Sequence, residues 1–295
     1  YKNAFLFAIK HKKIIAFKFL LTKHVKKNIK ILNKALLYAS GKGMLEITKL
    51  ILSSGANINY QYLSHDFKGD TALIRATSIG HYNLVKFLLL HGARVNMKGS
   101  FKETALINAS SQGSMKIVKL LISKGASVNT KGWLNTTALI EATRRGSLKI
   151  VKLLVSKGAI INAKAKYKSF PLMCAVEKGY FNIVKYLISK GAKIQIQNFV
   201  ISKDTPLILA SYKGYLKIVK YLITKGARIN YKNVYKKTAL IKAVQYGKIR
   251  IVKYLLKKRA KINIKDNNGR TALWYAKNGK QYKMVKLLKA AGAKE

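Results

Sequence analysis

Acidic residues are almost missing from this sequence. Only 9 Asp and Glu accompany 59 Lys and Arg in 295 residues, which gives a formal charge of +50. The codon usage of an AT-rich genome explains abundant Lys, Ile, Asn and Tyr, but such a genome encodes Glu just as readily. The scarcity of acids therefore favours selection for a polyanionic partner, because a field of this size drives association with opposite charge. The alternative is neutral sequence drift, in which the lysines are simply exposed to solvent.

Cysteine and long apolar runs are also scarce. The one cysteine, Cys174, excludes a disulfide within the chain and favours an intracellular compartment such as cytoplasm, nucleus or virion. No apolar run approaches the ~20 residues of a membrane-spanning helix, so we expect no membrane span. Hydrophobic residues still make up 49% of the chain, which suffices for a continuous core. Because the chain starts at Tyr1 inside a repeat-like segment, we expect a fragment or a processed form.

Histidine occurs at five positions, all in the first third of the chain. No Ser-His-Asp arrangement, carboxylate pair, metal-ligand spacing or glycine-rich phosphate loop stands out. Cys174 lies beside Met173 at an inner helical position and is predicted to be a small packing residue. We therefore predict no catalytic, cofactor-binding or metal-binding residues, no cofactor, no small-molecule substrate, and a protein that is not an enzyme.

An internal repeat organises the whole sequence. Gly-Ala pairs and Val-Lys or Thr-Lys steps recur in phase with a Thr-Ala-Leu triplet, mostly at intervals of 33 residues. The triplets begin at Thr71, Thr104, Thr137, Thr238 and Thr271, with variants at Phe170 and Thr205 and degenerate copies at Lys34 and Asn3. A fixed period of this length predicts a solenoid, in which each unit contacts only its neighbours. The sequence thus predicts one array over 1–295, with about nine units starting near residues 3, 34, 71, 104, 137, 170, 205, 238 and 271.

The repeat resembles the ankyrin repeat. Its motif is T-A/P-L-x-x-A, then G-x-x-x-I-V-K-x-L-I-x-K-G-A, then I/V-N, and it covers nearly the whole chain. The resemblance implies an all-α solenoid of helix pairs with β-hairpin-like finger loops. It also implies an interaction scaffold that binds a protein partner through its concave face and fingers.

Two departures from the family pattern bear on the fingers. An apolar residue such as Ile107 replaces the family's His, and the Asp-x-x-Gly pattern survives only at Asp66–Gly69 and Asp266–Gly269. We expect apolar packing to replace the hydrogen bonds that these residues make between neighbouring units. Asp66, Asp70 and Glu103 are expected to be ion-paired with the many lysines nearby.

The sequence pattern of each middle unit predicts two helices. In the second complete unit, Thr104 is expected to cap the first helix, Leu106 and Ala109 to face the core, and Gly113 to end that helix. An apolar stripe at helical spacing predicts the second helix, which Gly125 ends. The stripe consists of Ile117, Val118, Leu120, Leu121 and Ile122.

Aromatic and basic residues alternate at the predicted finger tips. One interpretation is a ladder of rings and cations along a groove, as in sequence-tolerant single-strand binders. The other is that each ring packs on the neighbouring finger; Trp133, one residue out of register, is the stronger contact candidate. The candidate finger residues are Phe101, Lys102, Trp133, Tyr167, Lys168, Tyr235, Lys236 and Lys237.

Variable positions of the first helices supply the remaining candidates. Tyr and Arg are enriched at interface hot spots, so such residues here indicate recognition. The alternative is that exposed helix positions vary freely. These candidates are Arg75, Arg144, Arg145, Tyr212, Lys242 and Tyr246.

The sequence therefore predicts a non-enzymatic scaffold with a basic surface that binds an acidic protein through its concave face and fingers. Binding of nucleic acid or another polyanion is the open alternative. That alternative includes a structural component of a virion or other nucleic-acid-rich particle.

Overall fold

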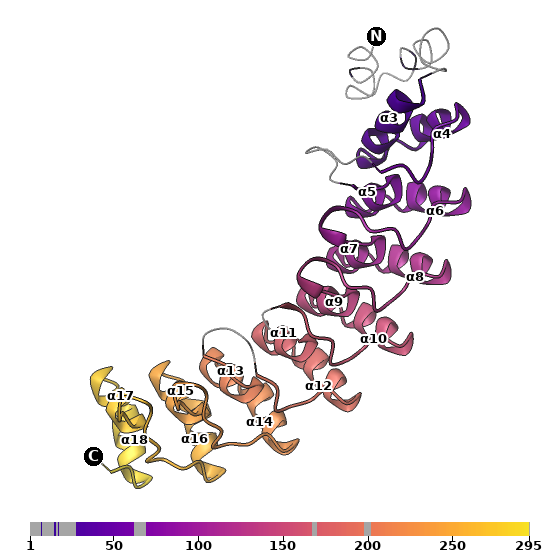
Figure 1. The fold of residues 1–295 in the computed structure, drawn as a ribbon. Coiled ribbons are helices and arrows are strands. Elements are labelled where there is room, and N and C mark those ends of the chain that lie inside the picture. Colours follow the sequence, from indigo (N-terminus) through magenta and orange to yellow (C-terminus); the bar gives the residue numbers. More distant parts are fainter. Residues whose placement is uncertain are drawn as a thin grey trace. The chain divides into compact units, whose positions relative to one another are not determined.

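The computed structural model describes residues 7, 15, 17, 28–61, 69–166, 170–197 and 202–294. The chain divides into two compact units, Tyr1–Ala159 (unit 1) and Ile160–Glu295 (unit 2). The described part contains sixteen α-helices in eight consecutive pairs (Figure 1). The ninth unit, predicted near residue 3, falls almost wholly outside the described residues.

Unit 1 holds four of these helix pairs and two short 3-10 turns. The first helices of successive pairs pack on one another, as do the second helices of the last three pairs. The α-helices are α3 (Ile29–Gly41), α4 (Leu45–Ser53), α5 (Ala72–Ser78), α6 (Tyr82–Leu90), α7 (Ala105–Gln112), α8 (Met115–Ser123), α9 (Ala138–Arg145) and α10 (Leu148–Ser156), and the 3-10 turns are η2 (Ser100–Lys102) and η3 (Trp133–Asn135).

Unit 2 repeats the same plan with four pairs. Its first helices pack in the order α11, α13, α15 and α17, and among its second helices α12 packs on α14 and α14 on α16. These helices are α11 (Pro171–Glu177), α12 (Phe181–Ser189), α13 (Pro206–Lys213), α14 (Leu216–Thr224), α15 (Ala239–Gln245), α16 (Ile249–Lys257), α17 (Ala272–Asn278) and α18 (Tyr282–Ala290).

Threonine starts most first helices, as the triplets predict. The hydroxyl of Thr104 accepts a hydrogen bond from the Ile107 amide at 3.3 Å, which satisfies one of the unpaired amides of the first turn. Phe170 makes no such cap, and Pro171 follows it at the first helical position, where no amide donor is lost. The same cap forms at Thr71, Thr137, Thr205, Thr238 and Thr271.

The core lies between the two helices of each pair. In unit 1, Leu106 of α7 and Ile117, Val118 and Leu121 of α8 are no more than 2% exposed. Gly113 ends α7 at φ 77°, a left-handed conformation that costs glycine little. The predictions for these helices and their ends are confirmed.

An asparagine after most second helices ties neighbouring repeats together. Asn96 donates through Nδ2 to the Gly125 carbonyl at 3.0 Å and accepts through Oδ1 from the Ser127 amide at 2.8 Å. Both bonds satisfy polar groups of the turn that follows the next second helix. The donated bond recurs at Asn59, Asn129, Asn162 and Asn263, and Gln195 makes it to Gly226.

The finger loops close as tight hairpin turns, and the described residues include no β-strand. In unit 1, the Gly99 amide donates to the Glu103 carbonyl at 2.8 Å, and the Lys102 amide donates to the Gly99 carbonyl. The same closing bond joins Gly132 to Thr136, and in unit 2 it joins Asn233 to Lys237 and Asp266 to Arg270. The fingers therefore resemble β-hairpins in their closing turns, but the described residues form no paired strands beside those turns.

Candidate functional site

A cation held between two tyrosines is the most developed surface cluster of unit 2. Lys242 Nζ lies 5.0 Å from the ring centroid of Tyr212 and 5.4 Å from that of Tyr246. The two ring centroids are 5.2 Å apart, and Lys213 Nζ lies 5.8 Å from the Tyr212 ring. These distances are within the range of cation–π attraction.

The helices fix this arrangement. Lys242 and Tyr246 are four residues apart, so they lie one turn apart on the same side of α15 and its C-cap. Tyr212 comes from α13, which packs on α15. Burial, followed by the nearby Asp204 carboxylate, raises the pKa of Tyr212 to about 12. Its hydroxyl therefore stays protonated at physiological pH and can donate a hydrogen bond.

A second polar cluster surrounds Asp266 in the last finger of unit 2. Its carboxylate accepts from the Tyr275 hydroxyl at 2.6 Å and from the amides of Asn268 and Arg270. Burial alone would raise the pKa of Asp266, but these hydrogen bonds and nearby Lys237 outweigh burial and hold it below its usual value. Lys237 Nζ lies 4.6 Å from the Tyr275 ring centroid, so this predicted contact residue is partly engaged within the fold.

Two exposed aromatic rings meet on neighbouring fingers of unit 1. Phe101 is 51% exposed and Trp133 is 52% exposed, and their ring centroids are 5.0 Å apart in an edge-to-face arrangement. The predicted packing of a ring on the next finger is confirmed for this pair. Because half of each ring is still exposed, the pair also forms an apolar patch beside the exposed Lys102.

Carboxylates also join the fingers. Asp70 Oδ1 accepts from the amide and hydroxyl of Ser100, and Glu103 Oε1 accepts from the Trp133 amide. In unit 2, Asn233 donates to Asp204 at 2.7 Å. Apolar packing between fingers is therefore accompanied by hydrogen bonds that the sequence analysis did not predict, in which an acid just before the triplet forms the cross-link.

The expected ion pairs also differ from those observed. The ion pairs between described residues are Lys49–Glu46 and Arg144–Glu141, so the acids of the finger cross-links are not among them. Burial raises the pKa of Glu103, and the Trp133 amide offsets only part of this effect. Asp66 lies outside the described residues.

Other predicted contact residues differ in their surroundings. Arg75 is half-buried and donates to the Leu37 carbonyl of α3 at 2.9 Å, which gives it a structural role. Arg144 and Arg145 are exposed on α9, as are Tyr235 and Lys236 on a finger of unit 2. Tyr167 and Lys168 lie outside the described residues.

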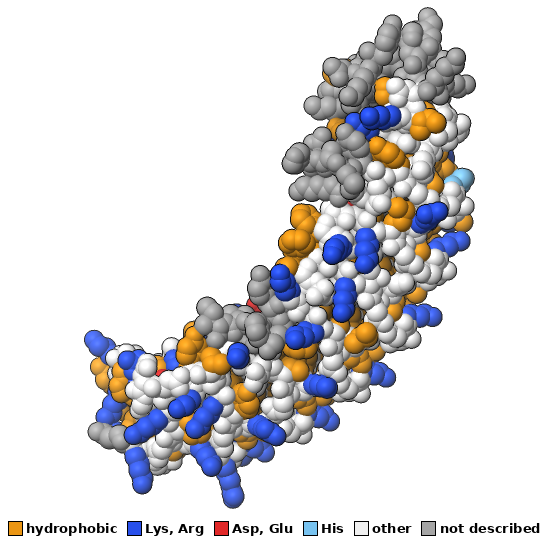
Figure 2. Space-filling view, viewed as in Figure 1, with side chains coloured by type: hydrophobic (Ala, Val, Ile, Leu, Met, Phe, Trp, Pro, Cys, Tyr) orange, Lys and Arg blue, Asp and Glu red, His pale blue; other side chains and the backbone are white. Residues whose placement is uncertain are grey.

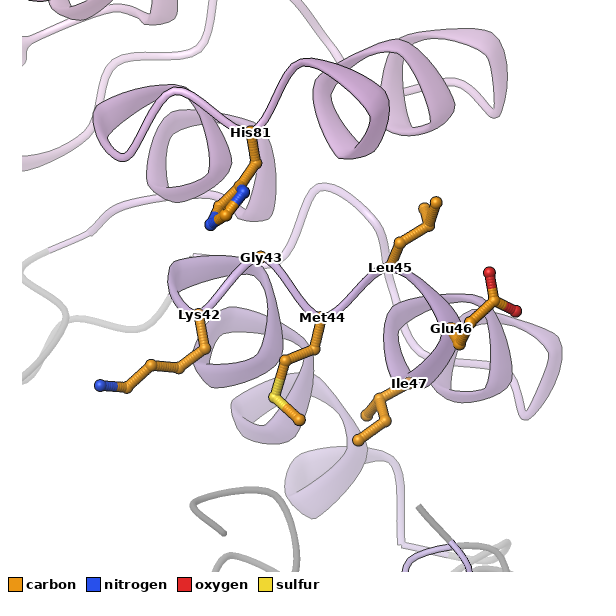
Figure 3. A pocket seen from close by; sticks show the side chains of 7 residues that line it. All are labelled: Lys42, Gly43, Met44, Leu45, Glu46, Ile47 and His81. Atoms are coloured by element: carbon orange, nitrogen blue, oxygen red, sulfur yellow. The ribbon is translucent and has the colours of Figure 1, made fainter. Parts of the chain in front are cut away.

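Shallow clefts among the described residues lie at the turns between first and second helices. The one in Figure 3 has a volume of about 360 Å³ and is lined by residues 42–47 and His81. His81 lies against Gly43, whereas Lys42 and Glu46 point away from it, so no reactive groups converge there. Glu46 is paired with Lys49.

The described residues hold no group of three or more His, Cys, Asp or Glu side chains that is arranged to bind a metal ion. Cys174 is buried, as predicted. None of the helices in the described ranges has the length and apolar character needed to cross a membrane.

Comparison with known proteins supports the repeat architecture over most of the chain. A family model described as "Ankyrin repeats (3 copies)" matches residues 36–132, 90–165, 131–198, 162–233 and 207–294. A stretch of 64 residues is 39% identical to the "Probable E3 ubiquitin-protein ligase XBOS32" of Oryza sativa subsp. japonica. A stretch of 64 residues is likewise 41% identical to the "E3 ubiquitin-protein ligase XBAT33" of Arabidopsis thaliana. Each alignment covers 22% of this chain and 12% of the relative.

Proposed function

Because the chain belongs to the ankyrin-repeat family, we propose that it is a non-enzymatic scaffold that binds an acidic segment of a partner protein. Ankyrin repeats support protein–protein interaction as the general role. The similarity to plant ubiquitin ligases covers 12% of those proteins, so it provides no support for ligase activity in this chain.

The cluster of Tyr212, Lys242 and Tyr246 carries the proposal. Tyrosine rings are rigid, amphipathic anchors that are enriched at interface hot spots. Lys242 supplies a positive charge between the two rings, and the protonated Tyr212 hydroxyl adds a donor. A partner carboxylate can accept from both groups while an adjacent apolar atom packs on the exposed Tyr246 ring.

Unit 1 offers a second contact patch of similar chemistry. Phe101 and Trp133 present a half-exposed aromatic pair, and Lys102 places a charge at the same finger tip. An acidic segment with an interspersed large apolar residue matches this combination of ring and cation.

The second candidate function is binding of nucleic acid or another polyanion, including a structural role in a virion or similar particle. The specific observation that favours it is the absence of acids from the second helices of unit 2.

The proposal is tested by selecting random peptides on the immobilised chain. We expect selected peptides to be enriched in Asp and Glu. The double variant Lys242→Gln/Tyr246→Ala should bind these peptides at least about tenfold more weakly, because it removes hot-spot contacts. The matched control is Lys283→Gln/Tyr282→Ala on α18, which removes the same charge and an exposed tyrosine. Selected peptides without acid enrichment, or equal losses in both variants, would contradict the proposal.

A further inference from the structure

The second helices of unit 2 form a surface without acids. Residues 180–197, 214–232, 247–265 and 280–294 cover these helices and the turns after them, and hold twenty-one Lys and Arg but no Asp or Glu. Fourteen of these cations, here called the basic track, occupy equivalent positions and are all exposed. They are Lys185, Lys190, Lys193, Lys217, Lys220, Lys225, Arg228, Arg250, Lys253, Lys258, Lys261, Lys283, Lys286 and Lys294.

The fold arranges the cations of the basic track in rows, because equivalent residues lie at the same place on successive second helices. The helices α12, α14 and α16 each bury an Ile-Val pair together with a leucine, and α18 buries Met284 and Leu288. This burial fixes the rotation of each helix and points the lysines outward. Figure 2 shows Lys and Arg side chains projecting along the edge where Figure 1 places these helices. Lys190, Lys225 and Lys258 are the C-caps of α12, α14 and α16, where the helix dipole favours positive charge.

Aromatic rings support part of the track. Lys220 Nζ lies 5.6 Å from the Tyr254 ring centroid of the next repeat, and Lys225 Nζ lies 5.7 Å from the Tyr221 ring. Phe181 packs edge-to-face on Tyr221 at 5.9 Å. These rings restrict the lysine side chains, so less conformational entropy is lost when the lysines engage a ligand.

Arg259 adds a cation beside the track at a cost in backbone strain. Its φ is 58°, whereas Gly226 and Gly292 occupy the equivalent position with a φ of 87°. A left-handed backbone is unfavourable for a residue that carries a side chain. Strain of this kind concentrates where a side chain has a function.

The chemistry of this surface fits phosphates better than lipid. Amphipathic elements bind membranes by inserting large apolar side chains, but the apolar residues of these helices are largely buried in the core, and Tyr282 is the large side chain most exposed on them. Packed helices lie ~8–10 Å apart, whereas a nucleic-acid duplex offers a phosphate charge every ~1.7 Å of its axis. Cations on each repeat can therefore meet a phosphate in any register, without reading the bases.

We propose, as a specific form of the second candidate function on which it rests, that the basic track of unit 2 binds the phosphate backbone of double-stranded nucleic acid without sequence specificity. This interaction uses the second helices, so it is separate from the proposed binding of an acidic protein by the first helices and fingers. Both can be present in one molecule.

The experiment measures the affinity of the full chain for a labelled mixed-sequence DNA duplex about two helical turns long, across a NaCl series. The test variant is Lys217→Gln/Arg250→Gln/Lys253→Gln. The control is Lys178→Gln/Lys203→Gln/Lys236→Gln, which removes the same charge from the ends of first helices and from fingers of unit 2. Thermal melts establish that both variants are folded.

We expect log K to fall steeply with log [NaCl] for the unaltered chain. The test variant should lower that slope by about 2.7, because each phosphate contact contributes ~0.9. The control should change it much less. Equal changes in both variants would overturn the proposal, because the attraction would then depend on net charge alone. Absence of duplex binding near physiological salt would also overturn it, as would tighter binding to phosphatidylserine vesicles through the same three residues. Peptide selection gives an independent result, so failure here leaves the scaffold function testable.

Discussion

The finger tips of the two units reach the same closed turn in different ways. In unit 1, Gly99 starts a tip whose two central residues, Phe101 and Lys102, are both left-handed, with φ of 54° and 61°. In unit 2, Asn233 occupies the place of Gly99, and its tip contains one left-handed residue, Lys236, at 55°. Both tips keep the closing hydrogen bond from the first residue to the carbonyl four residues later.

The position of one oxygen acceptor explains this difference. In the unit 2 tip, Asn233 Oδ1 accepts from the amides of Tyr235 and Lys237 of its own turn. In the unit 1 tip, the acceptor is Asp70 from the preceding finger, and it occupies the space that a side chain at Gly99 would need. The unit 1 tip therefore has only the cross-link from Asp70, and its turn is of type I′. The Asn233 tip has both kinds of bond, because its Nδ2 also donates to Asp204 of the preceding finger.

Removing the internal hydrogen-bond acceptor from a finger tip of unit 2 has the largest expected effect on stability. Asp266→Ala leaves the Asn268 and Arg270 amides and the buried Tyr275 hydroxyl without their acceptor. We expect a loss of about 2–3 kcal/mol in the free energy of unfolding. Urea unfolding followed by Trp274 fluorescence in a Trp133→Phe background reports on unit 2.

Asp266→Asn is the matched control for this change. Asn233 shows that an amide oxygen can accept from both backbone amides of such a tip. We expect the control to lose less than half as much stability as Asp266→Ala. Equal losses would mean that the charge of Asp266, not its acceptor geometry, stabilises the turn.

Adding a side chain to the unit 1 tip should have the next largest effect. A Cβ atom at Gly99 would lie 2.3 Å from Asp70 Oδ1 and 3.1 Å from Asp70 Cα. We expect Gly99→Ala to destabilise unit 1 by about 2 kcal/mol, as overpacking does in a closed site. Urea unfolding followed by Trp133 fluorescence, in a Trp274→Phe background, measures this loss.

The Asp70→Gly background sharpens this test. There, Gly99→Ala should cost clearly less, because its main obstacle is gone. Full additivity of the two changes would contradict the role given to Asp70.

Relieving the left-handed strain of the unit 1 tip should have a smaller, opposite effect. We expect Lys102→Gly to stabilise unit 1 by about 1 kcal/mol, since glycine adopts a φ of 61° without steric cost. Lys98→Gly removes the same charge at a position without positive φ and should give no gain. A stabilisation shared by both variants would assign the effect to charge.

The smallest expected effect is a difference between the two units in how their stability changes as the pH falls. The pKa of Asp266 is held below its ordinary value of 3.8, so its contribution to stability is present at neutral pH and is lost as pH falls through the folded-state pKa. The pKa of Glu103 is raised above 4.5, so the folded state binds this proton first, and unit 1 gains stability as pH falls toward 4.5. Urea midpoints at a series of pH values, read from each tryptophan, measure both trends. Glu103→Gln should abolish the gain and Asp266→Asn the loss.

Most of the fold could be predicted from the repeat, because its signals are local. Thr104 and Gly113 mark the ends of one helix, and the Ile117-Val118 pair identifies a buried face, all within one unit. The roles of Asp70 and Glu103 could not be predicted in this way. Each acts on a finger about 30 residues further along the chain, so its partner appears only when the units are stacked.

The site was predictable as a list of residue types but not as a geometry. Tyr212, Lys242 and Tyr246 are candidates from their positions on the first helices, but the contact of Tyr212 with the other two depends on the packing of α13 on α15. Arg75 has the same sequence signature as Lys242, but it donates to a carbonyl of α3 instead. Sequence position alone does not distinguish a residue that faces solvent from one that reaches the preceding repeat.

The proposed recognition of an acidic segment by the first helices of unit 2 is tested most directly by lysine-reactivity footprinting. The chain is compared with and without a selected acidic peptide. We predict that the peptide protects Lys242 and Lys213 and leaves Lys220 and Lys253 of the second helices unchanged. Equal protection of all four lysines, or no protection of Lys242 at saturating peptide, would contradict the claim.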